Sequence, residues 1–344
     1  MQVDILDGPD PQCDAFVSRT PGSRLAHLPA WGRMVQRVFG HRPYYLVARG
    51  QDGQDIEGVL PLTHVKTWLT GSVLVSQAFI DYGSILAAND SARDALYHRA
   101  VELAGELGCE SVEFRNIDPL PYEGLARRDD KVTLLIPLED GVEAVWMSFG
   151  ASVRKQTRKA EKHGLTAQIG GAELLNDFYS IYCRKMHELG TPAYPRKMMQ
   201  AMCETFPGMV DLFRVRLEDV TVAAGLMTFF NGIAEIPWSG TLDQYDHLYP
   251  NRLLYWTMIE HYTKKGAHLF DFGRSSVGGG NYEFKLRWHA HPVPLNYQYW
   301  LRPGKELSVL SPDNPRFRRK VEMWKKLPFR VARALGPIIA RQLP

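Results

Sequence analysis

The chain has 344 residues, of which 45% are apolar and 23% charged, and its formal net charge is +3. This length suggests two domains rather than one, and the composition is that of a soluble protein with no apolar run near the roughly 20 residues that cross a bilayer. The charge is uneven, because nine Lys or Arg and only two acids stand from Pro312 onward, whereas acids outnumber bases by four in the rest. An acidic body with a basic tail predicts an anionic partner at one end of the molecule.

The four cysteines, Cys13, Cys109, Cys183 and Cys203, form no CxxC pair and have no metal-like spacing. We therefore expect free thiols, buried for Cys109 and Cys203, with neither a disulfide nor a metal site, and a cytoplasmic location. The N-terminal stretch MQVDILDGPDPQCD lacks the basic and apolar regions of a signal peptide.

The first half of the chain predicts three strands, a helix and a further strand. The strands are expected at 43–50, 56–65, 71–79 and 109–116. The helix is expected at 91–108, because apolar residues recur at helical spacing between Ser91, its predicted N-cap, and Gly108, its predicted stop.

The second half predicts the same order of elements. Strands are expected at 210–217, 220–230, 233–241, 268–273 and 293–301, a helix at 251–266, and a short helix or turn at 281–289. Asn231-Gly232 is a strong hairpin signal, and Gly266 follows two lysines at the end of the helix. The repeated order predicts an α/β (α+β) chain of two domains with mixed, mainly antiparallel sheets, and it is the order of the GNAT acyltransferase core.

The stretch 278-GGGNYEFKLRWHA-290 places a lysine after three glycines. It is not a P-loop, because Lys285 comes five residues after Gly280 and is followed by Leu rather than Ser or Thr. The glycines then form either a flexible turn beside an ordinary surface lysine, or a loop that closes over a ligand. The second reading is favoured because Phe284 and Trp288 would anchor the segment.

Three stretches together resemble the FemAB-like proteins, also described as BioF2-like acetyltransferase-domain proteins of the GNAT superfamily. They are 271-DFGRSSVGGGNYEFKLRWHAHPVPLNYQYWL-301, 152-SVRKQTRKAEKHGL-165 and 76-SQAFIDYG-83, and the resemblance spans about residues 25–302. The most similar members are those found with PEP-CTERM/exosortase and exopolysaccharide genes. The resemblance implies two tandem GNAT-like domains, 1–148 and 149–303, with a substrate cleft between them and a basic tail over 304–344.

The resemblance also implies a reaction centre at Phe284 and Lys285, with the lysine stabilising negative charge on the transferring acyl group. A fixed ammonium near a developing oxyanion in a dry site is worth a few kcal/mol. Tyr282 would help Phe284 to shape the pocket. Asp271 is the best candidate for a general base, although the substrate itself can assist.

Basic residues recur at helical spacing in 152-SVRKQTRKAEKHG-164. Arg154, Arg158 and Lys162 stand at i, i+4 and i+8, which makes one helix face strongly basic. This face is either a solvated charged surface or a contact for a nucleotide-linked, lipid-linked or RNA substrate. In the second case Arg154, Arg158 and Arg274 would hold phosphate or carboxylate groups.

Three further residues are predicted to bind substrate. Arg196, in 192-PAYPRKMMQAM-202, resembles an arginine that reaches a substrate phosphate in the family. Asp81 and Tyr82 lie in 76-SQAFIDYG-83 and either face the cleft or end a strand.

Characterised members of this family transfer an amino acid from aminoacyl-tRNA to the amine of a cell-wall (peptidoglycan) precursor. We therefore predict an acyl- or aminoacyltransferase that acts on an amine of a cell-envelope or exopolysaccharide precursor, a lipid-linked or nucleotide-linked saccharide or peptide. The donor would be aminoacyl-tRNA or acyl-CoA, with no metal and no DNA partner. Residues 245–254 contain no glycine, which argues against the Gly-rich turn that holds the pyrophosphate of CoA.

The alternatives are a CoA-dependent N-acyltransferase of an amino sugar and a non-catalytic, membrane-associated scaffold. A nucleic-acid-binding module rests only on the basic helix and tail and lacks an aromatic stacking platform.

The tail 315–344 mixes basic and apolar residues and predicts an interfacial amphipathic helix, interrupted at Pro328 and Pro337. It either attaches the protein to the inner face of the membrane or packs on the body.

Overall fold

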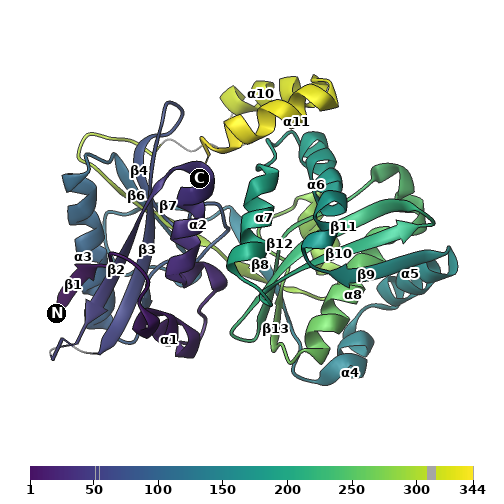
Figure 1. Cartoon of the computed structure of the whole chain (residues 1–344), viewed down its shortest axis with the longest axis horizontal. Coiled ribbons are helices and arrows are strands. Elements are labelled where there is room, and N and C mark those ends of the chain that lie inside the picture. The colour runs from purple at the N-terminus through teal and green to yellow at the C-terminus, as the bar shows by residue number, and fades with distance from the viewer. Residues whose placement is uncertain (51, 54, 308–314, 344) are drawn as a thin grey trace. The chain divides into compact units, whose positions relative to one another are not determined.

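The structure is a computed structural model that describes residues 1–50, 52–53, 55–307 and 315–343, without the side chains of 315–318. The chain divides into two compact units (Figure 1). Unit 1 comprises Met1–Val132, Pro294–Ser308 and Arg341–Pro344, and unit 2 comprises Thr133–Val293 and Val309–Ala340. These ranges differ from the expected 1–148, 149–303 and 304–344, because the strand near 131–137 pairs in the second sheet and the strand near 296–301 returns to the first.

Unit 1 is built on a mixed sheet in the order β1-β2-β3-β4-β6-β16-β7, with β5 paired to β3. All of its strand pairs are antiparallel except β4 with β6, which the helix α3 connects. The strands are β1 Gln2–Ile5, β2 Arg42–Arg49, β3 Ile56–Thr67, β4 Gly71–Ser76, β5 Leu86–Ala87, β6 Ser111–Asn116, β7 Ala126–Arg128 and β16 Asn296–Leu301. The helices are α1 Pro11–Arg19, the 3-10 turn η1 Leu25–His27, α2 Pro29–Phe39 and α3 Asp90–Glu106.

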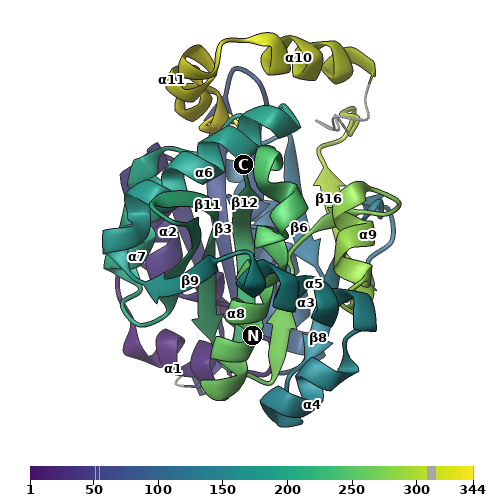
Figure 2. The ribbon, with the colours of Figure 1, turned by 90° about the vertical axis from the view of Figure 1, so that its right-hand side faces the viewer.

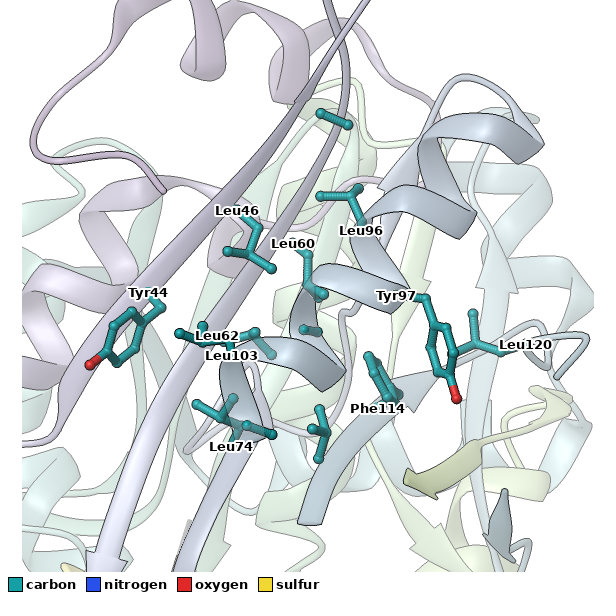
Figure 3. Close-up of a cluster of buried hydrophobic side chains, with 14 of the residues drawn as sticks. Tyr44, Leu46, Leu60, Leu62, Leu74, Leu96, Tyr97, Leu103, Phe114 and Leu120 are labelled. Atoms are coloured by element: carbon teal, nitrogen blue, oxygen red, sulfur yellow. The ribbon is translucent and has the colours of Figure 1, made fainter. Parts of the chain in front are cut away.

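The helix α3 covers one face of this sheet, and α1 and α2 lie on the other (Figure 1). Apolar side chains alternate along β2 and β3, so that one set meets α3 in a core that Figure 3 shows in close-up. Leu46, Leu60, Leu96, Tyr97 and Phe114 lie in it. This core makes unit 1 a packed body of its own.

Truncating Phe114 to alanine should lower the free energy of unfolding of unit 1 by about 3–5 kcal/mol, because its ring is fully buried and leaves a cavity. Trp68 is 80% exposed, so Trp68→Ala serves as the control and should change stability little. Denaturant unfolding followed by circular dichroism measures both, and equal effects would contradict the packing described.

Unit 2 has a second mixed sheet in the order β14-β8-β13-β12-β11-β10-β9, with β15 paired to β8. In it β13 runs parallel to β12 and antiparallel to β8. The strands are β8 Lys131–Pro137, β9 Leu165–Gly170, β10 Val210–Leu217, β11 Val220–Phe230, β12 Ile233–Thr241, β13 Leu269–Asp271, β14 Ser275–Ser276 and β15 His291–Pro294. The helices are α4 Gly141–Ser148, α5 Ala151–Lys162, η2 Ala172–Leu174, α6 Leu175–Leu189, α7 Arg196–Thr205, η3 Asp243–Leu248, α8 Pro250–Lys264, α9 Gly280–Leu286, α10 Pro315–Lys326 and α11 Phe329–Ala340.

Most of the predicted strands and helices are present, with small differences at their ends. Asn231 and Gly232 form the expected tight turn, with φ of 47° and 73°. The N-cap of α3 is Asn89 rather than Ser91, because the Asn89 side chain accepts the Ala92 N–H. The strand β4 ends at Ser76 rather than at 79, where the positive φ of Gln77 breaks the extended backbone.

All four cysteines are free thiols, as predicted. Cys109 is buried, whereas Cys203 is only half-buried, contrary to the prediction for it. Burial still raises the pKa of the Cys203 thiol to about 11, which keeps it unreactive at neutral pH. Within the described ranges, no helix has the length and apolar character needed to cross a membrane.

The tail folds as the two helices α10 and α11, which pack against α6 (Figures 1 and 2). Pro328 separates them as predicted, but Pro337 lies inside α11 and does not interrupt it. The expectation for Pro337 was therefore wrong. Gly336 packs directly on the Ala193 backbone, which holds the helix in place through this turn.

Candidate functional site

Lys285 lies near the end of α9, the short helix that follows the three glycines. Its side chain is buried, and Nζ donates to the main-chain carbonyls of Gly273 at 2.8 Å and Arg274 at 3.2 Å. The lysine therefore fixes α9 to the turn that leaves β13. The predicted surface-lysine alternative is excluded by this burial.

Asp271 is the last residue of β13 and is completely buried. Its Oδ1 accepts hydrogen bonds from the Thr133 hydroxyl at 2.5 Å and from the Gly273 N–H at 2.8 Å. Asp271 and Lys285 thus hold the same turn, 271–274. Asp271 accepts a hydrogen bond from the Gly273 N–H, and Lys285 donates to the Gly273 and Arg274 carbonyls. This geometry favours a positioning role for Asp271 over the general-base role predicted for it.

Phe284, the residue before Lys285 in the sequence, packs against other aromatic rings. Phe284 is half-buried and meets Tyr255 edge to face, with ring centroids 5.1 Å apart. Tyr255 also stacks on Phe272 at 5.4 Å and shares a 2.9 Å hydrogen bond with Ser239, and burial raises the pKa of its phenol. Phe284, Tyr255 and Phe272 thus form one aromatic group at α9, the helix that carries Lys285.

A second buried acid, which the sequence analysis missed, stands beside Asp271. Glu235 on β12 is the register partner of Asp271 in the parallel pair β12–β13, and it is 4% exposed. The sequence did contain a signal for this buried acid, because Glu235 is the only acidic residue in the mainly apolar strand IAEIPWSGT.

Arg252 in the first turn of α8 was also missed. It is 4% exposed, its Nε donates to Gln156 Oε1 at 2.9 Å, and its guanidinium lies 4.6 Å from the Phe284 ring centroid. Burial, followed by the nearby charge of Arg287, lowers the pKa of Arg252 to about 10. A buried cation thus borders the same aromatic group.

The arginines predicted to hold phosphate have other contacts. Arg154 donates to the carbonyls of Met147 at 2.7 Å and Phe149 at 2.6 Å, so it caps the end of α4. Arg158 is exposed, and its guanidinium lies 5.5 Å from the Trp146 ring centroid. Both arginines thus contact residues in or next to α4. Their binding to a substrate phosphate stays a prediction.

The remaining predicted residues of unit 2 lie on its surface or at its edge. Arg196 begins α7 and donates to Asn176 and Gln200, each at 3.1 Å. The Arg274 side chain is exposed, and Tyr282 is half-buried on α9. Five of the predicted site residues therefore lie in the segment 271–286. Asp271 and Arg274 belong to the end of β13 and the turn after it, and Tyr282, Phe284 and Lys285 belong to α9.

Asp81 and Tyr82 belong to unit 1. Tyr82 is 4% exposed, accepts a 3.1 Å hydrogen bond from Arg24 and packs with Leu295, Tyr297 and Tyr299. It therefore packs in the core of unit 1, and its role as a substrate contact stays a prediction. Asp81 is half-buried, and its main-chain carbonyl accepts the Tyr297 hydroxyl.

The N-terminus of α8 is where a GNAT-type pyrophosphate turn was looked for. Tyr249 precedes it in the left-handed region at φ 62°, and Pro250 supplies no N–H. The Arg252 and Leu253 N–H groups both donate to the Tyr249 carbonyl. These two amides and the proline leave few free N–H groups at this helix start, and the absence of a pyrophosphate turn stays a prediction. In the part of the chain that the structure describes, no group of three or more His, Cys, Asp or Glu could hold a metal ion.

Residues 147–286 match the model of the family described as "Acetyltransferase (GNAT) domain". This stretch is therefore similar to a GNAT acetyltransferase domain. It begins in α4 and ends with α9, so the buried Lys285 lies at its very end. No curated protein matches the sequence.

Solved structures similar to this chain include FemX, at 16% identity and a TM-score of 0.68, with 87% of this chain and 97% of that chain covered. L-PGS from Bacillus licheniformis has 15% identity and a TM-score of 0.56, over 93% and 98%. A tandem GNAT protein from the clavulanic acid biosynthesis pathway has 12% identity and a TM-score of 0.54, over 89% and 99%. The predicted fold class is confirmed: the chain is an α/β protein with a tandem GNAT-like fold, as in FemX.

Proposed function

We propose that the protein is an acyl- or aminoacyltransferase that forms an amide on an amine acceptor. The observation that carries this proposal is the buried Lys285 ammonium, fixed by two carbonyls at the end of the stretch that matches a GNAT domain. A preorganised cation in a dry site suits a reaction in which a carbonyl oxygen gains negative charge.

The amine nitrogen attacks the acyl carbonyl carbon, and the carbonyl oxygen becomes an oxyanion that the Lys285 ammonium stabilises. The bond from carbon to the donor's oxygen or sulfur then breaks, and the proton lost by the amine goes to the leaving group. Asp271 holds the turn that positions Lys285, and Phe284 and Tyr282 shape the pocket.

The donor we propose is aminoacyl-tRNA, and the acceptor is an amine on a cell-envelope precursor. The proline at the start of α8 and the engaged amides beside it support a donor other than CoA. Exposed Lys155, Lys159 and Lys162 on α5 supply charge for a nucleic-acid backbone. The link to exopolysaccharide and PEP-CTERM systems rests on the sequence resemblance.

A thermal-shift titration with acetyl-CoA and CoA tests the choice of donor. A ligand at about 100 times its dissociation constant adds roughly 2.7 kcal/mol of stability, which is visible as a rise in melting temperature. We expect no saturable shift. A saturable shift would favour the rival function, a CoA-dependent N-acyltransferase of an amino sugar.

The helix α11 supports a membrane surface as a further partner. Val331, Leu335 and Ile338 follow one another at i, i+4 and i+7, and they are 42%, 40% and 63% exposed. The opposite face, with Ala332 and Gly336, is buried. The tail therefore packs on the body and still presents an apolar stripe among basic residues, as an interfacial helix does.

Replacing Val331, Leu335 and Ile338 by serine should abolish flotation with anionic liposomes, while the melting temperature stays within a few degrees because these side chains are exposed. The wild-type protein should float with anionic vesicles and much less with neutral ones. A wild-type protein that stays at the bottom of the gradient would remove the membrane partner from the proposal.

A further inference from the structure

A cavity of about 330 Å³ lies at the N-terminal end of α5 in unit 2. Gly150, Ser152 and Val153 from the start of α5 line it, together with Arg252 from α8 and Arg287 and Glu283 from α9 and its end. It is distinct from the Lys285 turn, because neither Lys285 nor residues 271–274 line it.

The first turn of α5 leaves this cavity rich in backbone donors. The N-cap is Gly150, and no side chain caps the helix there. The first N–H groups of a helix have no partner within the helix, and the helix dipole adds partial positive charge at this end. An uncapped end of a 12-residue helix therefore favours an anion.

Arg252 provides the second and independent observation. Its side chain is 4% exposed, Nε is bonded to Gln156, and Nη1 is buried without a hydrogen-bond partner. Leaving a charged donor unpaired inside a protein is costly, so such a group usually has a ligand.

The charges around the cavity are not balanced within the described part of the chain. Arg252 and Arg287 are close enough that the second lowers the pKa of the first. Glu283 lines the cavity as well, and its side chain is exposed. Two guanidinium groups and a helix N-terminus against one exposed carboxylate leave a net positive site.

We propose that this cavity binds a phosphate group, held by the Arg252 guanidinium, the first amides of α5 and Arg287. Arginine and helix amides together match the several acceptor oxygens of a phosphate, and the volume exceeds that of the ion alone. The phosphate is either free inorganic phosphate or a phosphodiester at the nucleotide end of a donor. Binding of free phosphate does not depend on the proposed acyl transfer, whereas binding of a phosphodiester rests on the proposed tRNA donor.

Isothermal titration of the full-length protein with inorganic phosphate, and separately with the trinucleotide CpCpA, tests the proposal. Saturable binding of either probe is expected. Arg252→Met should weaken it by about 10- to 100-fold, since a hydrogen bond to a charged group is lost, while Arg216→Gln, a change at a surface arginine paired with exposed Asp219, should leave it unchanged.

A second variant covers the case in which Arg252→Met does not fold. Ser152→Asp places a carboxylate in the first turn of α5, where it suits the helix and competes with a bound anion, so it should also weaken binding at least tenfold. Phosphate-only binding would identify the free ion, and tighter CpCpA binding the phosphodiester. No binding to the wild type, or binding that both variants retain, would overturn the proposal.

Discussion

Replacing Lys285 by alanine is expected to lower the rate of acyl transfer by roughly 100- to 1000-fold, the usual cost of removing one oxyanion-stabilising donor. The ammonium is buried and held by the Gly273 and Arg274 carbonyls, so solvent cannot replace it without reorganising the turn. The loss should fall mainly on kcat, because the interaction forms with the transition state.

Lys264→Ala is a matched control, because this lysine is exposed on α8 and pairs with Glu260 across one helical turn. It should leave both rate and stability unchanged. Melting temperatures measured in parallel separate the catalytic effect of Lys285→Ala from its structural effect. Undiminished transfer by a folded Lys285→Ala protein would remove Lys285 from the mechanism.

Replacing Asp271 by alanine should lower the melting temperature of unit 2 by roughly 6–12 °C. The change leaves the Thr133 hydroxyl and the Gly273 N–H without the charged acceptor that they share, at a cost of about 3 kcal/mol. Differential scanning calorimetry measures this shift.

The pH profile then distinguishes the two roles considered for Asp271. As a positioning residue, its loss should lower kcat and leave the shape of the pH profile unchanged. As a general base, its loss should remove the acidic limb of the profile. The double variant Thr133→Ala/Asp271→Ala should be less destabilised than the sum of the single changes, because the two residues share one hydrogen bond.

Local patterns in the sequence predicted much of the fold. The Asn231-Gly232 turn and the helix that ends before Gly266 were found because short-range chemistry determines both. The exchange of β8 and β16 between the two sheets was missed, since strand pairing over more than 130 residues leaves no local signal. The interruption predicted at Pro337 was also wrong, because α11 continues through this residue to Ala340.

The candidate site was predicted unevenly. Resemblance identified Phe284 and Lys285, but it did not identify Arg252, a buried arginine beside Phe284 that the sequence places in an apolar helix without any motif. Arg154 was chosen for its spacing on α5, yet its guanidinium caps α4. The spacing of charged residues shows which of them share a helix face. Only the packing of the folded chain shows which of them are buried.

The most direct test is single-turnover transfer of a radiolabelled amino acid from aminoacyl-tRNA to small amines, with wild-type protein and Lys285→Ala in parallel. Formation of labelled amide that depends on the wild-type protein and falls at least 100-fold in the variant is the predicted result. Absence of amide with aminoacyl-tRNA and with acetyl-CoA alike would contradict a transferase function.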